Sequence, residues 1–389
     1  MCAGSCLVCF FVFSAPRGGC FPLIVCCVCS IWNQNISAVC FIDVILHYQT
    51  EKNATVPAMD SGEKKLSILF LVNPKSGVSR KRRVPQMVEK YIDRARYDVA
   101  VCYTQYAGHA YELARDAAAR GVDVVVAVGG DGTVNEVGRA IVHTATALAV
   151  IPCGSGNGFA RHVGIPIGVK SAIEFINKAE PVDIDYGKIN GQPFFCSCGM
   201  GFDAVVSSDF AKGKGRGVFN YIRYSLLDWV KYRPETYVVE TEEMKETFEA
   251  FVIACGNASQ YGNNAYIAPF ASMRDGLATV SILSPFNAFE VPLMATHLFT
   301  HTFDESTHVS ILTAPWIRIV REKAGPVHFD GEPYEMGKEL LVEMVAGGIK
   351  VLAAPGWDGT SAPVPLYRQL YEMFAGSLPD LPEIELKKW

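Results

Sequence analysis

The chain has 389 residues, 50% of them hydrophobic, and a formal net charge of −5. This length is sufficient for two domains with separate cores. The negative charge gives no electrostatic basis for nucleic-acid binding, and the short basic run at residues 80–83 is typical of a solvated helix start. We therefore expect no nucleic-acid partner.

The first 58 residues differ in composition from the rest of the chain. Eight of the 13 cysteines lie before residue 61, and the five later ones are typical of reduced thiols in buried strands. Two apolar runs, at residues 7–13 and 21–29, are each shorter than the roughly 20 residues of a membrane-spanning helix. We expect residues 1–58 to lie outside the folded core, which would begin near Met59; a membrane-associating segment is the alternative.

Strands alternate with helices from residue 59 to about residue 181. Strands are predicted at 66–72, 98–103, 123–128 and 147–151, and helices at 80–94, 108–118, 134–143, after 158, and at 169–178. This alternation predicts an α/β domain with a parallel sheet and right-handed crossovers.

The third predicted strand, residues 123–128, leads into a glycine-rich turn. Its β-branched run without polar alternation indicates a strand covered on both faces. Glycines in the turn allow positive φ angles and a close approach of ligand to main-chain N–H groups, and Thr133 with Glu136 forms a T-x-x-E capping box. Asp131 lies where phosphate is expected, and its carboxylate would repel a phosphate group unless a divalent cation lay between the two. The turn therefore predicts a magnesium–nucleotide site, with Asp131 as a plain turn residue as the alternative.

Two more glycine-containing loops follow predicted strands. Because the carboxyl ends of parallel strands gather along one edge of a sheet, the three loops should converge on one crevice. The expected nucleotide-contacting residues are Asn73, Lys75, Ser76, Gly77, Thr104, Gly129, Gly130, Gly132, Thr133, Asn135, Glu136, Gly154, Ser155, Gly156 and Asn157. Lys75 and Arg161 are the cations nearest in sequence, and each is either a phosphate or substrate ligand or a solvated surface charge.

From about residue 182 the pattern changes to short strands. They are predicted at 192–198, 236–240, 249–255, 277–283, 308–312, 316–320, 340–345 and 349–353, with helices near 218–232 and 291–300. Residues 182–353 are thus expected to form a β-rich domain, a sandwich. Residues 354–389 form a tail whose apolar residues at helical spacing, from Leu366 to Phe374, predict a docking helix.

These motifs together resemble the diacylglycerol kinase catalytic domain family, which includes bacterial lipid kinases and sphingosine kinases. The resemblance covers residues 65 to about 353. It rests on residues 73–77, 129–136 and 154–157, and continues through 201–204, 254–257, 261–262, 275–277 and 330–332.

The resemblance implies an ATP-dependent kinase that phosphorylates a lipid hydroxyl, with ATP and Mg²⁺ bound between the two domains. It implies Glu332 as the catalytic base, Asp131 as the residue that positions metal or substrate, and Asp203 as a supporting residue of the substrate site. It also implies a structural magnesium ion at Asp275. Without the resemblance, the segments around Glu332 and Asp275 are typical of plain turns.

One departure from the family pattern leaves the acceptor lipid open. Gly158 stands where many bacterial members have aspartate, so both diacylglycerol and a sphingoid base remain candidate acceptors. We expect a cytoplasmic protein with peripheral membrane contact, and leave a homodimer open.

The sequence allows three other interpretations. NAD kinase shares the G-G-D-G-T turn, but its N-E pair lies well downstream, whereas Asn135 and Glu136 follow the turn directly. A non-catalytic lipid or nucleotide sensor with the same fold is a second alternative. His297 and His301, four residues apart on a predicted helix, are expected to face solvent or core rather than to bind zinc, because no H-E-x-x-H glutamate accompanies them.

Overall fold

The computed structural model describes residues 65–75, 83–212, 232–365 and 369. Predictions for residues 1–58, for Ser76 and Gly77, for nearly all of the helix near 218–232 and for the C-terminal docking helix lie outside the described residues.

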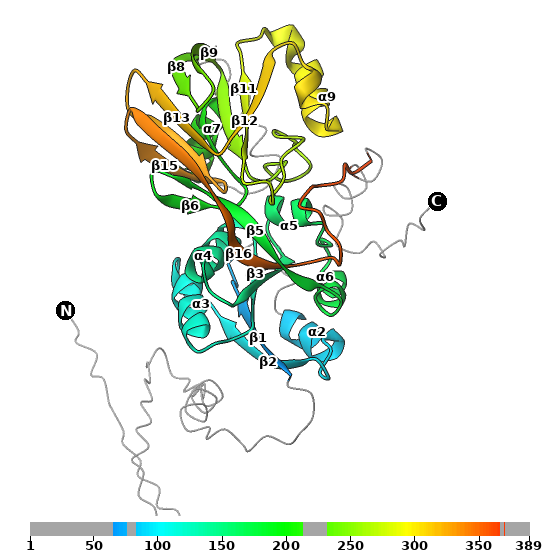
Figure 1. The fold of residues 1–389 in the computed structure, drawn as a ribbon. Coiled ribbons are helices and arrows are strands. Elements are labelled where there is room, and N and C mark those ends of the chain that lie inside the picture. Colours follow the sequence, from blue (N-terminus) through cyan, green and yellow to red (C-terminus); the bar gives the residue numbers. More distant parts are fainter. Residues whose placement is uncertain (1–64, 76–82, 213–231, 366–368, 370–389) are drawn as a thin grey trace, which may run out of the picture. The chain divides into compact units, whose positions relative to one another are not determined.

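A parallel sheet forms the first half of the fold (Figure 1). Its strands are β1 (Leu66–Val72), β2 (Tyr97–Tyr103), β3 (Val124–Gly129) and β4 (Ala147–Pro152), in the order β2-β1-β3-β4. All residues of β3 and β4 are buried, which agrees with their unbroken apolar sequences. The prediction of a parallel α/β arrangement is confirmed.

Helices cover both faces of this sheet. They are α2 (Val84–Tyr91), α3 (His109–Ala119), α4 (Asp131–Ile141), α5 (Gly158–Val163) and α6 (Val169–Ile176). In Figure 1, α3 and α4 lie together on one side of the strands and α2 and α6 on the other. Because β1 has β2 on one side and β3 on the other, the direction of strand addition reverses between β1 and β3. Such a reversal opens a crevice at the carboxyl ends of the strands.

The second half is a β-sandwich, as predicted. One layer is an antiparallel sheet in the order β12-β11-β10-β7-β14-β15. Its strands are β7 (Ser197–Gly201), β10 (Val252–Gly256), β11 (Ala278–Leu283), β12 (Val309–Ala314), β14 (Gly325–Phe329) and β15 (Glu332–Met336). The other layer continues the first sheet through β5 (Glu180–Ile189), β6 (Gln192–Phe194), β8 (Glu235–Glu240), β9 (Lys245–Ala250), β13 (Trp316–Arg321) and β16 (Glu339–Ala353). Apolar residues from both layers share one buried core.

Several strand predictions in this half were wrong in detail. Segments 340–345 and 349–353 belong to the single strand β16, because β5 pairs with it on both sides of a bulge between Val345 and Ile349. The predicted strand 192–198 is divided between β6 and β7. The strands β5, β9, β14 and β15 were missed, since they carry charged residues or proline that mask the alternation of apolar and polar positions. Among the described residues of this half, the α-helices are α7 (Phe202–Lys212) and α9 (Val291–Thr300), of which α9 has the predicted bounds.

Candidate active site

The loops after β1, β3 and β4 meet at one edge of the parallel sheet. The Asn73 backbone N–H donates to Val128 O at 3.1 Å, and its side-chain amide donates to Thr133 Oγ1 at 3.1 Å. On the other side, Cys153 N donates to Gly129 O at 2.7 Å. The three loops therefore converge as the order of the strands requires.

Close packing, rather than positive φ, explains the glycines of these loops. None of Gly129, Gly130 and Gly132 has a positive φ angle, so that part of the sequence interpretation was wrong. A Cβ on Gly129 would collide with the Thr133 side chain, and a Cβ on Gly130 would lie 3.0 Å from the Gly154 Cα. Glycine here allows two loop backbones to touch.

The predicted capping box does not form. Helix α4 begins at Asp131, two residues before Thr133, and its N-cap Gly130 provides no side chain. Thr133 instead accepts the hydrogen bond from Asn73 described above. The Glu136 carboxylate accepts N–H bonds from the start of α3, at 2.9 Å from Gly108 and 3.1 Å from Ala110. Glu136 thus fixes α3 beside the crevice.

Asn157 and Arg161 shape the loop after β4. Asn157 lies in the left-handed region with φ 54°. Its side chain accepts from Gly154 N at 2.9 Å and donates to Gly154 O at 3.0 Å. Arg161 donates to Gly156 O at 3.3 Å and to Asn264 Oδ1 at 3.0 Å. The Arg161 side chain therefore connects this loop to Asn264 in the second half of the fold.

The remaining predicted loop residues differ in exposure. Lys75 and Ser155 are exposed at the loop tips, where Lys75 N donates to Asn73 Oδ1 at 2.9 Å. Thr104 is buried at the end of β2, and its N–H donates to Val72 O at 2.9 Å. Lys75 is thus a solvent-accessible cation beside the converging loops.

Two carboxylates flank Gly132. Burial raises the pKa of Asp131 from 3.8 to about 6, the Phe159 N–H opposes the shift, and the negative charge of Asp330 adds to it. Phe159 N donates to Asp131 Oδ1 at 3.3 Å. On the other side, the exposed Glu332 side chain packs so closely that a Cβ on Gly132 would lie 3.0 Å from its Oε1. Glu332 begins β15, whereas Asp131 begins α4, so the two carboxylates come from the two halves of the fold.

Asp330 holds the turn that carries Glu332. Its buried carboxylate accepts from Cys196 N at 2.7 Å, from Phe195 N at 2.9 Å and from the Asn135 side-chain amide at 2.7 Å. Burial raises the pKa of Asp330, and these donors oppose the shift. Our site prediction did not include Asp330, although it opens the segment 330–332 that carries part of the family resemblance.

Asn135 is a bridge between the two halves of the fold. Its amide nitrogen donates to Asp330 and also to Pro193 O at 3.3 Å. These two bonds use both hydrogens of the amide group. The Asn135 side chain therefore donates to protein groups, and not to a nucleotide in the loop crevice as we predicted.

Asp203 lies in the first turn of α7 and is buried. It accepts hydrogen bonds from Tyr261 and His328. Tyr261 belongs to the segment 261–262 that carries part of the family resemblance, but we assigned it no role, and His328 was not singled out from the sequence.

Asp275 lies in a different environment from Asp131. It accepts from Leu277 N at 3.0 Å, and its pKa is raised by burial and by the charge of Asp185. Asp185 itself accepts from Gly276 N at 2.7 Å and Gly347 N at 2.8 Å. Over the described ranges, no group of three or more His, Cys, Asp or Glu residues is arranged to hold a metal ion.

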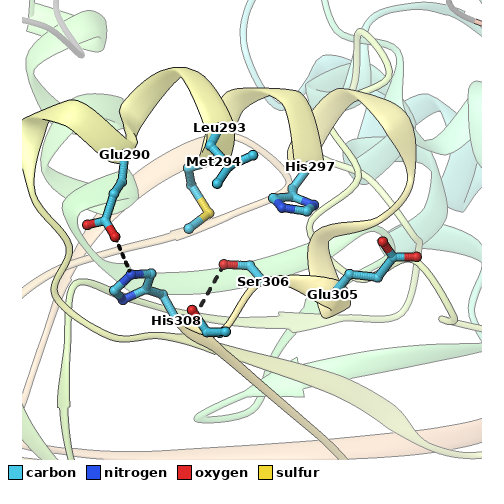
Figure 2. Close-up of a pocket in the computed structure, with 8 residues that line it drawn as sticks. Glu290, Leu293, Met294, His297, Glu305, Ser306 and His308 are labelled. Atoms are coloured by element: carbon cyan, nitrogen blue, oxygen red, sulfur yellow. Dashed lines mark hydrogen bonds and ion pairs between the residues drawn. The ribbon is translucent and has the colours of Figure 1, made fainter.

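The pocket in Figure 2 lies elsewhere, beside α9. It has a volume of about 170 Å³, and an ion pair of 3.0 Å joins His308 Nε2 to Glu290 Oε1 at its rim. His297 also lines it, whereas His301 packs on the Tyr266 ring at 4.7 Å. Ligand sites typically measure about 300–1,000 Å³, so this pocket is too small for a nucleotide.

Family models match both halves of the chain. Residues 67–189 match the diacylglycerol kinase catalytic domain, and residues 196–353 match the YegS C-terminal NAD kinase beta sandwich-like domain.

None of the helices in the described part of the chain is long and apolar enough to span a membrane.

Individual relatives agree with these matches. A protein of Chromohalobacter salexigens named "Probable lipid kinase YegS-like" is 29% identical over 273 residues, which cover 68% of this chain and 86% of the relative. A protein of the same name from Yersinia enterocolitica is 26% identical over 259 residues, which cover 64% and 86% of the two chains. The crystal structure of a diacylglycerol kinase from Bacillus anthracis superposes with a TM-score of 0.60 at 21% identity, covering 76% of this chain and 99% of that one. At 21% identity, this structural similarity is evidence for the fold alone.

Proposed function

We propose, since the chain belongs to the diacylglycerol kinase catalytic domain family, that it transfers the γ-phosphoryl group of ATP to the hydroxyl of a membrane lipid. One observation carries the proposal. Asp131 and Glu332 flank Gly132 at the edge where three loops converge. Phosphoryl transfer depends mainly on positioning and charge neutralisation, and this arrangement is suited to both.

The three loops would hold the phosphates. Backbone N–H groups at a helix N-terminus favour anions, and α4 and α5 both begin at these loops. Lys75 is exposed beside them and would add a positive charge. Arg161 would act by supporting the loop at Gly156.

Asp131 would hold Mg²⁺ beside the phosphates. Its raised pKa indicates an environment in which an ionised carboxylate is costly, and a divalent cation would reduce that cost. Magnesium in kinase sites is commonly bound through one or two carboxylates, phosphates and water, so a single carboxylate fits. When bound, Mg²⁺ supplies neutralisation of phosphate charge. Asp275, beside Asp185, remains a proposed ligand of a second, structural cation.

Glu332 would act as the general base. Its carboxylate takes the proton of the acceptor hydroxyl while the lipid oxygen forms a bond to the γ-phosphorus, and the bond from phosphorus to the ADP oxygen breaks. The exposed position of Glu332 leaves it accessible to an acceptor. The Asp330 contacts to β7 and Asn135 fix the turn that carries it.

The acceptor resides in a bilayer, so we also propose peripheral membrane contact. The surface of α9 and of the turn before it supports this: Phe289 in the turn is 95% exposed, and Leu293 and Phe299 in α9 are 59% and 37% exposed. No acidic or basic residue other than histidine occurs from residue 291 to 303. Exposed apolar residues in a segment without Lys, Arg, Asp or Glu are suited to contact with a lipid layer.

An assay with γ-labelled ATP, Mg²⁺ and mixed-lipid vesicles tests the proposal. We expect label in the organic extract, with diacylglycerol, monoacylglycerol, ceramide and sphingosine offered separately. ATP binding without turnover would favour a sensor, and labelled NADP formed from added NAD would favour an NAD kinase. Either result would refute the proposal.

A further inference from the structure

A buried polar cluster lies on the face of the six-stranded sheet that α7 covers. We call Asp203, Tyr261 and His328 the Asp203 cluster. Tyr261 donates its hydroxyl to Asp203 Oδ2 at 2.6 Å, and His328 Nε2 lies 2.8 Å from the same oxygen. Because a bare ring nitrogen would repel a carboxylate oxygen at that distance, Nε2 carries the proton. Asp203 and His328 are 7% and 3% exposed.

Tyr261 connects this cluster to the candidate active site. A Cβ on Gly158 would lie 3.0 Å from the Tyr261 carbonyl oxygen, so the Tyr261 backbone packs against the loop after β4. A Cβ on Gly156 would lie 3.6 Å from that same oxygen and 3.2 Å from Asp131 Oδ2. The Asp203 carboxylate is therefore one tyrosine side chain away from the loop that Asp131 touches.

An aromatic layer adjoins the Asp203 cluster. The Phe202 and Phe251 rings stack at 4.5 Å between centroids, and Tyr232 meets Phe251 edge-on at 5.2 Å. Lipid and drug sites combine such apolar walls with a few placed polar groups. The cluster and this layer are thus suited to the headgroup end of an acceptor lipid.

The Oδ2 atom of Asp203 is already occupied. It has two lone pairs, and Tyr261 and His328 take both. Asp203 Oδ1 accepts from Ala204 N at 2.8 Å. Gly199 packs against Oδ2, since a Cβ there would collide with Asp203 Oδ2 and would lie 2.6 Å from His328 Nε2. An ammonium group would have to displace Tyr261 or His328 to pair with Asp203 Oδ2.

We propose that His328 is a specificity-determining positioning residue. By occupying Asp203 Oδ2, it makes the site prefer an acceptor with an uncharged hydroxyl headgroup, of the diacylglycerol class, over an ammonium-bearing sphingoid base. His328 Nδ1 is buried and has no hydrogen-bond partner in the described segments, so the bond to Asp203 is the polar contact that orients the ring. The inference rests on the proposed lipid kinase function.

The test compares kcat/KM for diacylglycerol and sphingosine in matched vesicles. His328→Phe removes the donor but keeps a ring, and we expect the sphingosine-to-diacylglycerol ratio to rise about tenfold, the scale of a hydrogen bond to a charged group. His328→Gln places an amide donor near the position of Nε2 and should restore the wild-type ratio. Tyr261→Phe removes the other donor to the same oxygen and should also raise the ratio, which provides a second route if His328→Phe does not fold.

Three outcomes would overturn the inference: a wild-type preference for sphingosine, an unchanged ratio in both Phe variants, or an equal change in His328→Gln and His328→Phe. A wild-type enzyme that phosphorylates no lipid would instead refute the proposed function. The two failures are therefore distinguishable in one data set.

Discussion

Asp131→Asn should inactivate the protein and also stabilise it near neutral pH. The pKa of Asp131 is raised from 3.8 to about 6, chiefly by burial. Each unit of difference between the folded and unfolded pKa values corresponds to about 1.4 kcal/mol of stability. The stabilisation by Asp131→Asn is therefore at most ~3 kcal/mol. Because the side chain is only partly buried, solvent screening reduces the expected gain to about 1–2 kcal/mol.

The sign of this effect depends on pH. A raised pKa means that the folded protein holds the proton more tightly, so the stabilising contribution is present below pH 3.8 and is lost as pH rises through about 6. Asparagine stays neutral throughout. The free energy of unfolding of Asp131→Asn should therefore match that of the wild type near pH 4 and exceed it at pH 7–8.

Urea denaturation at several pH values measures the difference directly. A second arm adds Mg²⁺ with a non-hydrolysable ATP analogue, which should raise the Tm of the wild type more than that of Asp131→Asn. A stability difference that does not vary with pH would refute the electrostatic reasoning. An equal ligand-induced rise in both proteins would refute the role of Asp131 in holding the cation.

Three further predictions follow from the site and its supports. Glu332→Gln should lower kcat by about 10²–10⁴-fold with ATP affinity and Tm unchanged, whereas Glu335→Gln, on the same exposed strand, should stay near wild type; equal losses would exclude a specific base. Gly158→Asp should destabilise by about 1–3 kcal/mol in urea denaturation, because its Cβ would lie 3.0 Å from a backbone carbonyl, while Gly337→Asp, with open space around it, should not. Burial lowers the pKa of His162 from 6.5 to about 4, so the wild type should lose stability as pH falls between these values, and His162→Gln should flatten that slope in thermal unfolding.

The parallel sheet and its loops could be predicted because their signals are local. Uninterrupted β-branched runs mark strands such as β3, and the loop after each strand is placed by the parallel order alone. The bounds of β1 and α9 were obtained from the sequence to the residue.

The misread residues have partners that are distant in sequence. Thr133 and Glu136 have the spacing of a capping box, but Asn73, 60 residues earlier than Thr133, and the start of α3 provide competing partners. Asn135 lies 195 residues from Asp330, and His328 lies 125 residues from Asp203. No pattern along the chain identifies such pairs, because they exist only once the two halves are packed.

Transfer of label from γ-labelled ATP into extractable lipid, measured side by side for the wild type, Glu332→Gln and Asp131→Asn, tests the central claim most directly. The account predicts a labelled phospholipid from the wild type and at least a hundredfold less, on the order of the loss of a general base, from Glu332→Gln. It also predicts that Glu332→Gln still binds ATP. Equal labelling by wild type and Glu332→Gln, or no labelled lipid from the wild type with any acceptor, would contradict it.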